Sequence, residues 1–213
     1  MKIDQEKVNW LLAVPVVGLG IGYVLLLGYM LWGNVLGVKA STRATSPVAR
    51  PATVDLWDAY GQAHAAAQAQ SGDARLVSAS TQWHGVSEDA LLAGTSNWTF
   101  VFHSPAEDHS LDVVVNAGEA RVVNQTQVWN APTALAEGAW QAAGPRDALL
   151  AFLACEGRTF LDEHPQAVVD LHLAAGDGGK PVWSIVAMDP ESQKLVALLV
   201  DAETGQVLST RSP

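Results

Sequence analysis

Twenty-one uncharged residues run from Leu11 to Leu31, and they constrain the topology of the chain more than any other feature. At about 1.5 Å per helical residue, such a run spans a hydrocarbon core of about 30 Å. Trp10 and Trp32 bracket it, where amphipathic rings favour the headgroup level of a membrane. The sequence therefore predicts a transmembrane helix over residues 11–32, preceded by an N-terminal tail of residues 1–10.

A secretory signal peptide is the competing interpretation, but its apolar region would run for only about 7–15 residues before a cleavage site. Gly18 and Gly22 lie about one helical turn apart, a spacing that lets another membrane helix approach closely. Basic residues are nearly balanced on the two flanks of the run, so they do not settle its orientation. Because long domains translocate largely regardless of charge, we expect a single-pass cell-membrane protein with a cytoplasmic N-terminus and an extracytoplasmic C-terminal domain.

The part of the chain beyond residue 50 is strongly acidic. It holds 20 of the 22 acidic residues but only seven of the 12 basic residues, which gives it a formal charge of −13. This charge excludes nucleic acid as a partner, because a nucleic-acid site needs a basic surface. Residues 33–53, small and polar in their second part and containing two prolines, are predicted to form an irregular stalk.

One order of elements occurs twice in the acidic part. Alanine-rich residues 54–70 predict a helix, and four runs rich in β-branched or aromatic residues predict strands at 75–83, 98–103, 111–116 and 120–127. A second helix is predicted to begin at Pro145, and four more strands follow it at 167–174, 182–188, 194–201 and 206–210.

Internal identity favours a tandem duplication. A shift of 85 residues aligns residues 98–123 with 183–208, and it matches Trp98 with Trp183. We therefore predict an α+β fold in which a transmembrane helix precedes two helix-plus-antiparallel-sheet units, with a first repeat at 54–128, a linker at 129–144 and a second repeat at 145–213. Each unit is small enough that its core would be marginal alone. The two are expected to pack together, with Trp129 and Trp140 covering their junction.

A short motif lies at the end of the second unit. Trp183 is in one predicted strand, and Asp-Ala-x-Thr-Gly runs from Asp201 to Gly205 before the last strand. This arrangement resembles the PepSY domain, whereas the first unit departs from it and has Asn116 in place of the aspartate. The resemblance implies a helix on a small antiparallel sheet, usually outside the cytoplasm and associated with peptidase inhibition or with scaffolding of membrane assemblies. It carries over no catalytic residue.

The motif also has a physical interpretation of its own. Between two strands, Asp201 is predicted to accept local backbone hydrogen bonds, and Gly205 to supply a positive φ. Trp98 and Trp183 are predicted to cap the core between helix and sheet, with stacking on a ligand as the alternative.

We predict no catalytic, cofactor-binding or metal-binding residue. The six histidines have no spacing typical of a metal site. One predicted hairpin loop could hold a metal ion weakly, although a solvated turn is the simpler interpretation; it contains His103, Glu107, Asp108 and His109. Cys155, the only cysteine, is expected in the core on an apolar helix face.

Together these features predict a non-catalytic, membrane-anchored accessory subunit. Its expected partners are membrane lipid and the integral membrane subunits of a larger complex, with no small-molecule substrate. A bacterial respiratory or photosynthetic electron-transfer complex is a candidate host. The alternative is an extracytoplasmic regulator or inhibitor of a peptidase.

Overall fold

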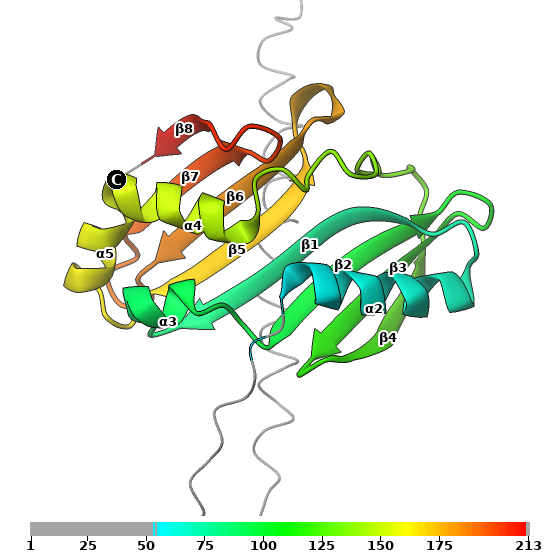
Figure 1. Cartoon of the computed structure of the whole chain (residues 1–213), viewed down its shortest axis with the longest axis horizontal. Coiled ribbons are helices and arrows are strands. Elements are labelled where there is room, and N and C mark those ends of the chain that lie inside the picture. Colours follow the sequence, from blue (N-terminus) through cyan, green and yellow to red (C-terminus); the bar gives the residue numbers. More distant parts are fainter. Residues whose placement is uncertain (1–52, 54, 212–213) are drawn as a thin grey trace, which may run out of the picture. The chain divides into compact units, whose positions relative to one another are not determined.

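The structure is a computed structural model that describes residue 53 and residues 55–211 (Figure 1). Contacts divide the chain into the units Met1–Ala49 and Arg50–Pro213, and the described residues all lie in the second unit. The predicted membrane helix over 11–32, with Trp10, Gly18, Gly22 and Trp32, lies outside the described residues. Among the described residues, no helix has the length and apolar character needed to cross a membrane.

The first half of the described chain contains two helices and four strands. They are α2 Leu56–Gln70, β1 Arg75–His84, α3 Glu88–Leu92, β2 Asn97–Ser104, β3 His109–Asn116 and β4 Glu119–Gln127. Asp55 caps α2, because its Oδ1 accepts a hydrogen bond of 2.8 Å from the Trp57 N–H. The short helix α3 was not predicted from the sequence.

The second half again begins with helical elements and ends with four strands. They are α4 Pro145–Phe152, a π-helical turn Leu153–Gly157, α5 Arg158–Glu163, β5 Val168–Ala175, a short 3₁₀ turn Asp177–Gly179, β6 Pro181–Met188, β7 Leu195–Asp201 and β8 Val207–Arg211. All eight strands overlap the runs, rich in β-branched or aromatic residues, that were predicted to form them. The mixed helix and antiparallel-sheet fold is therefore confirmed.

All eight strands form one antiparallel sheet, in the order β4-β3-β2-β1-β5-β6-β7-β8. The two halves meet through backbone pairing of β1 with β5, in a register that runs from Ser78 opposite Ala174 to His84 opposite Val168. The expectation that two units would pack against one another is thus refined, because they share one continuous sheet.

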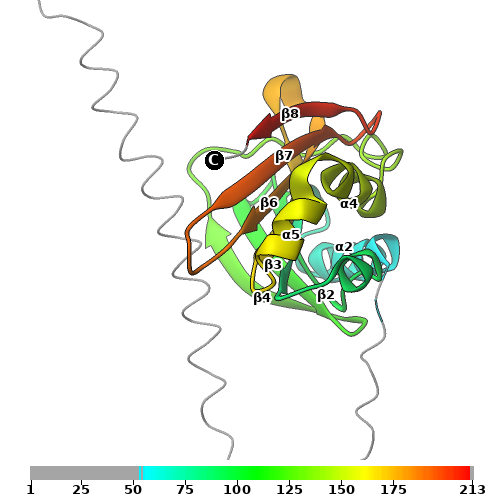
Figure 2. The same ribbon diagram turned by 90° about the vertical axis from the view of Figure 1, so that its left-hand side faces the viewer.

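The helices cover one face of this sheet (Figures 1 and 2). Helix α2 contacts β2, β3 and β4, and α4 contacts β6 and β7. The helix α2 turns Ala59, Ala63 and Ala67 toward the sheet, and all three are fully buried. Small side chains at this spacing let the helix lie close to the strands.

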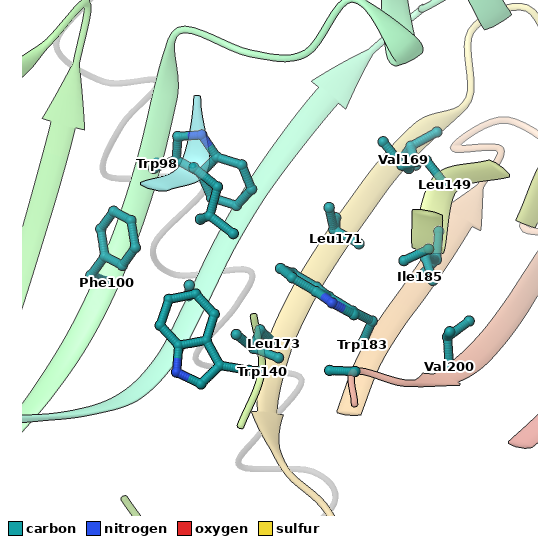
Figure 3. Packing of buried hydrophobic residues seen from close by; sticks show 14 of the residues in the cluster. Trp98, Phe100, Trp140, Leu149, Val169, Leu171, Leu173, Trp183, Ile185 and Val200 are labelled. Carbon is teal, nitrogen blue, oxygen red and sulfur yellow. The ribbon is translucent and has the colours of Figure 1, made fainter. Parts of the chain in front are cut away.

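The core lies between the helices and the sheet. Both aligned tryptophans belong to it: Trp98 is 3% exposed and Trp183 is fully buried (Figure 3). Trp98 pairs across the strands with Val115, and Trp183 pairs with Val200. The two pairs are related by the same shift of 85 residues.

Two sequence expectations about the packing were wrong. Cys155 is exposed, because the π-helical turn that contains it turns its side chain away from the sheet. Trp129 is 91% exposed, so it does not cover the junction of the two halves. Trp140 is buried against α2, where its ring stacks on Trp57 with a centroid separation of 4.8 Å and meets Tyr60 edge-on at 5.0 Å.

Candidate functional site

The face of the sheet opposite the helices carries an aliphatic patch. Along β6 and β7, alternate side chains such as Ile185 and Leu198 are buried beneath α4, so the intervening ones point to the other face. We define the aliphatic patch as these intervening apolar residues, namely Val186, Met188, Leu195, Ala197 and Leu199. Cross-strand pairing joins Val186 to Ala197 and Met188 to Leu195.

The aliphatic patch is accessible within the described part of the chain. Met188 and Leu195 are each 37% exposed and Leu199 is 38% exposed. No described helix lies over this face, since all of them cover the other one (Figure 2). Contiguous apolar surface of this kind marks interaction sites on proteins.

A polar strip borders the patch where β1 meets β5. Gln82 Nε2 donates a hydrogen bond of 2.7 Å to Asp170 Oδ1. Burial raises the pKa of Asp170, and the bond from Gln82 opposes this. The His172 side chain keeps an exposed edge, yet desolvation of its ring against the sheet lowers its pKa, while Asp170 opposes the change. Desolvation at this strip therefore disfavours the charged forms of both Asp170 and His172.

The motif residues form a tight turn between β7 and β8. Asp201 Oδ1 accepts hydrogen bonds from the N–H groups of Glu203, at 2.8 Å, and Thr204, at 2.9 Å. These bonds lower the pKa of Asp201, and the bond from the Thr204 N–H contributes most. Gly205 has a φ of +72° and its N–H bonds the Asp201 carbonyl. The carboxylate of Asp201 is therefore engaged in holding the turn.

Two further carboxylates are engaged in the same way. The Ser104 hydroxyl donates to Asp73 and is the first cause of the lowered pKa of that group. The Ser192 hydroxyl donates to Asp189 and likewise is the first cause of its lowered pKa. His164 Nδ1 lies 3.1 Å from Asp189 Oδ2, the same oxygen that accepts from Ser192. These acids hold loops in place and have little capacity left for acid–base chemistry.

Trp183 also has a structural contact. Its Nε1–H donates a hydrogen bond of 2.8 Å to the Ala143 carbonyl, and the ring lies among Leu171, Leu173 and Ile185 (Figure 3). A fully buried ring with its polar atom satisfied offers no surface on which a ligand could stack.

The hairpin loop between β2 and β3 does not gather metal ligands. His109 Nδ1 lies 3.7 Å from Glu107, whose carboxylate also accepts a bond of 2.7 Å from the Ser71 hydroxyl. His103 is buried in the sheet with its Nε2 unpartnered. Within residues 55–211, no three His, Cys, Asp or Glu side chains are placed to share a metal ion.

A cleft of about 620 Å³ lies between α2, the start of β1 and residues 133–140. Tyr60 and His64 stack in its wall with centroids 5.4 Å apart. Burial, together with the charge of Glu137, raises the pKa of Tyr60. This cleft could not be predicted from the sequence, because its wall combines α2 with a linker that follows β4.

A PepSY domain is found at residues 158–211, where the chain matches the family described as "Peptidase propeptide and YPEB domain". The match covers α5 and β5 to β8, and it includes the whole aliphatic patch. No curated protein matches the chain. Among solved structures, a crystal structure described as a "putative lipoprotein" from Clostridium difficile 630 is 15% identical, with a TM-score of 0.46, and the alignment covers 72% of this chain and 92% of that one.

Proposed function

We propose that this protein is a non-catalytic, extracytoplasmic binding protein that serves as an accessory subunit of a larger membrane assembly. The observation that carries the proposal is the aliphatic patch, which lies inside the PepSY domain, is partly exposed and occupies a sheet face that no described helix covers. Burial of apolar surface contributes about 25 cal/mol per Å², so a partner that covers this patch gains affinity there. The partner is a protein with a complementary apolar surface.

The anchor and the domain limits are part of the same proposal. Residues 11–32 hold the protein in the membrane, residues 33–53 form the stalk, and the PepSY domain acts outside the cytoplasm. Neither the fold nor the PepSY match points to an electron-transfer complex, so the proposal names no host.

We also propose that the chain arose by tandem duplication. The repeated order of a helical element and four strands supports this, as does a sheet order that runs outward from β1 and β5 in the two halves. The equal registers of Trp98 opposite Val115 and Trp183 opposite Val200 support it further. On this view the first half is a diverged copy that braces the second.

The test is recovery of the full-length, C-terminally tagged protein from native membranes in mild detergent, followed by mass spectrometry. Leu199→Glu places a charge in the aliphatic patch, and we expect it to reduce recovery of the partner at least about tenfold, which corresponds to about 1.4 kcal/mol. Leu150→Glu is the matched control, because Leu150 is 43% exposed on α4, away from the patch. The proposal fails if the unsubstituted protein is recovered alone, or if both variants recover the partner equally.

The PepSY match favours a second candidate, a regulator or inhibitor of an extracytoplasmic peptidase. In that case the same experiment returns a peptidase whose activity changes when the purified full-length protein is added. A peptidase activity that is unchanged by saturating protein would remove this candidate.

A further inference from the structure

The outer edge of β4 is a long strand edge that no described residue pairs with. The sheet order places β4 at one end and β8 at the other, with nine residues in β4 and five in β8. In an antiparallel ladder, alternate residues direct their N–H and C=O groups to opposite sides, so the free edge of β4 leaves roughly four residues unpaired. Such an edge is a template for another extended strand.

The edge of β4 has little of the protection that sheet edges usually carry. Charged residues, proline, bulges and short length are the usual devices. Glu119 and Arg121 pair at one end of β4, at 2.9 Å, and a bulge lies near Val123. From Val122 to Ala136, however, the chain has no charged residue. Over residues 122–129 it has no proline, and valine, threonine and tryptophan favour extended structure.

This neutral edge belongs to a part of the chain whose formal charge is −13. Two acidic copies repel each other least where their facing surfaces carry no charge. The exposed side chains along the edge are amides and a hydroxyl; they are Asn124, Gln125, Thr126 and Gln127. Asn124 Nδ2 donates to Asp112 of β3 and to the Thr126 hydroxyl, and Gln125 bonds His109, while their remaining polar atoms pair well with the same groups on an identical strand.

Two apolar side chains flank the amides and add contact area. Val123 is 59% exposed and Trp129 is 91% exposed. Tryptophan is among the residues that contribute most to protein interfaces. A second strand that pairs with β4 therefore meets backbone groups, uncharged amides, Val123 at the middle of the strand and Trp129 just beyond its end.

We propose that the partner of this edge is a second copy of the same chain. Its β4 pairs antiparallel with the first β4, about a two-fold axis, so that two eight-stranded sheets become continuous. The edge is distinct from the aliphatic patch, and the inference does not depend on the proposed function.

The first test is a cysteine scan of the full-length protein in a Cys155→Ser background. Single cysteines replace the residues from Asn124 to Gln127 in turn, with Ser209→Cys in β8 as the matched control, because it is exposed on the opposite edge. Paired antiparallel strands hold opposite Cα atoms about 4.5–5.5 Å apart, within disulfide range. We expect the yield of disulfide-linked dimer to reach one maximum along β4, and we expect no such dimer for Ser209→Cys. Equal cross-linking at both edges, or none at β4, overturns the proposal.

The second test measures the molar mass of the full-length protein in detergent as a function of salt. Each copy carries a large negative charge, so salt screens their repulsion and the dimer tightens, by at least about threefold in dissociation constant as the Debye length falls from about 10 Å to about 3 Å. Thr126→Lys places like charges on the two paired strands, so the molar mass should fall to that of one copy. Ser209→Lys, on the opposite edge, should leave the molar mass at that of the dimer. A dimer that weakens with salt, a single-copy mass throughout, or a foreign strand recovered on β4 overturns the proposal.

Discussion

At the residue scale, single close contacts decide which substitutions the fold tolerates. Gly157 ends the π-helical turn, and a Cβ added there would overlap the ring of Phe152. That ring is fully buried in the core, so it has nowhere to move. Gly61 in α2 is the opposite case, because a Cβ there would meet nothing within 4 Å.

We therefore expect Gly157→Ala to lower the free energy of unfolding by about 1–3 kcal/mol, as overpacked cores do. Gly61→Ala should leave it unchanged or raise it by up to about 1 kcal/mol, because alanine is the better helix former. Denaturation of the full-length variants in urea measures both values. Equal effects of the two substitutions would contradict the contact between Gly157 and Phe152.

At the element scale, Asp189 holds the loop between β6 and β7 and connects it to the end of α5. Its carboxylate accepts hydrogen bonds from the hydroxyl and the N–H of Ser192, and His164 lies 3.1 Å away. These contacts hold the pKa of Asp189 below its ordinary value of 3.8, and the bond from the Ser192 hydroxyl contributes most. The ionised group is thus favoured in the folded state.

The consequence is a stability that depends on pH. A carboxyl whose folded pKa is lowered stabilises the fold above its unfolded pKa, and this contribution is lost as the pH falls through the folded value. The Asp189→Asn variant should therefore have a lower Tm than the unsubstituted protein at neutral pH. Between about pH 4 and about pH 2, its Tm should fall by less than that of the unsubstituted protein. Asp177→Asn, at an exposed position in the 3₁₀ turn, is the control. Parallel Tm curves for Asp189→Asn and the unsubstituted protein would count against the role of this loop.

At the scale of the whole described unit, the pairing of β1 with β5 makes the two halves one sheet. Their cores are also continuous, because the buried residues of both halves form one cluster. If one half unfolded alone, the strand at the junction of the other half, β1 or β5, would lose its pairing on one side. We expect the unit to unfold in a single cooperative transition.

The expectation is tested with Phe100→Ala in the first half and Ile185→Ala in the second, both at fully buried positions. Each should shift the whole urea transition, by about 3–5 and about 2–5 kcal/mol respectively. Circular dichroism and tryptophan fluorescence should report the same midpoint in each variant. Two separate transitions, with only one moved by each substitution, would show that the halves fold independently.

The sequence by itself determined the positions of the eight strands and of the main helices, because these depend on residue types, turn signals and helical spacing that a chain carries in each short segment. Only the tertiary structure decided that β1 pairs with β5, that Cys155 and Trp129 are exposed, and that no described helix covers the aliphatic patch. The physical reason is that alternation tells which side chains share a face, while pairing partners and cover come from segments distant in the chain. The sequence of a segment such as Leu195–Leu199 does not reveal whether the face of the strand that points away from the core contacts a helix, a partner or water.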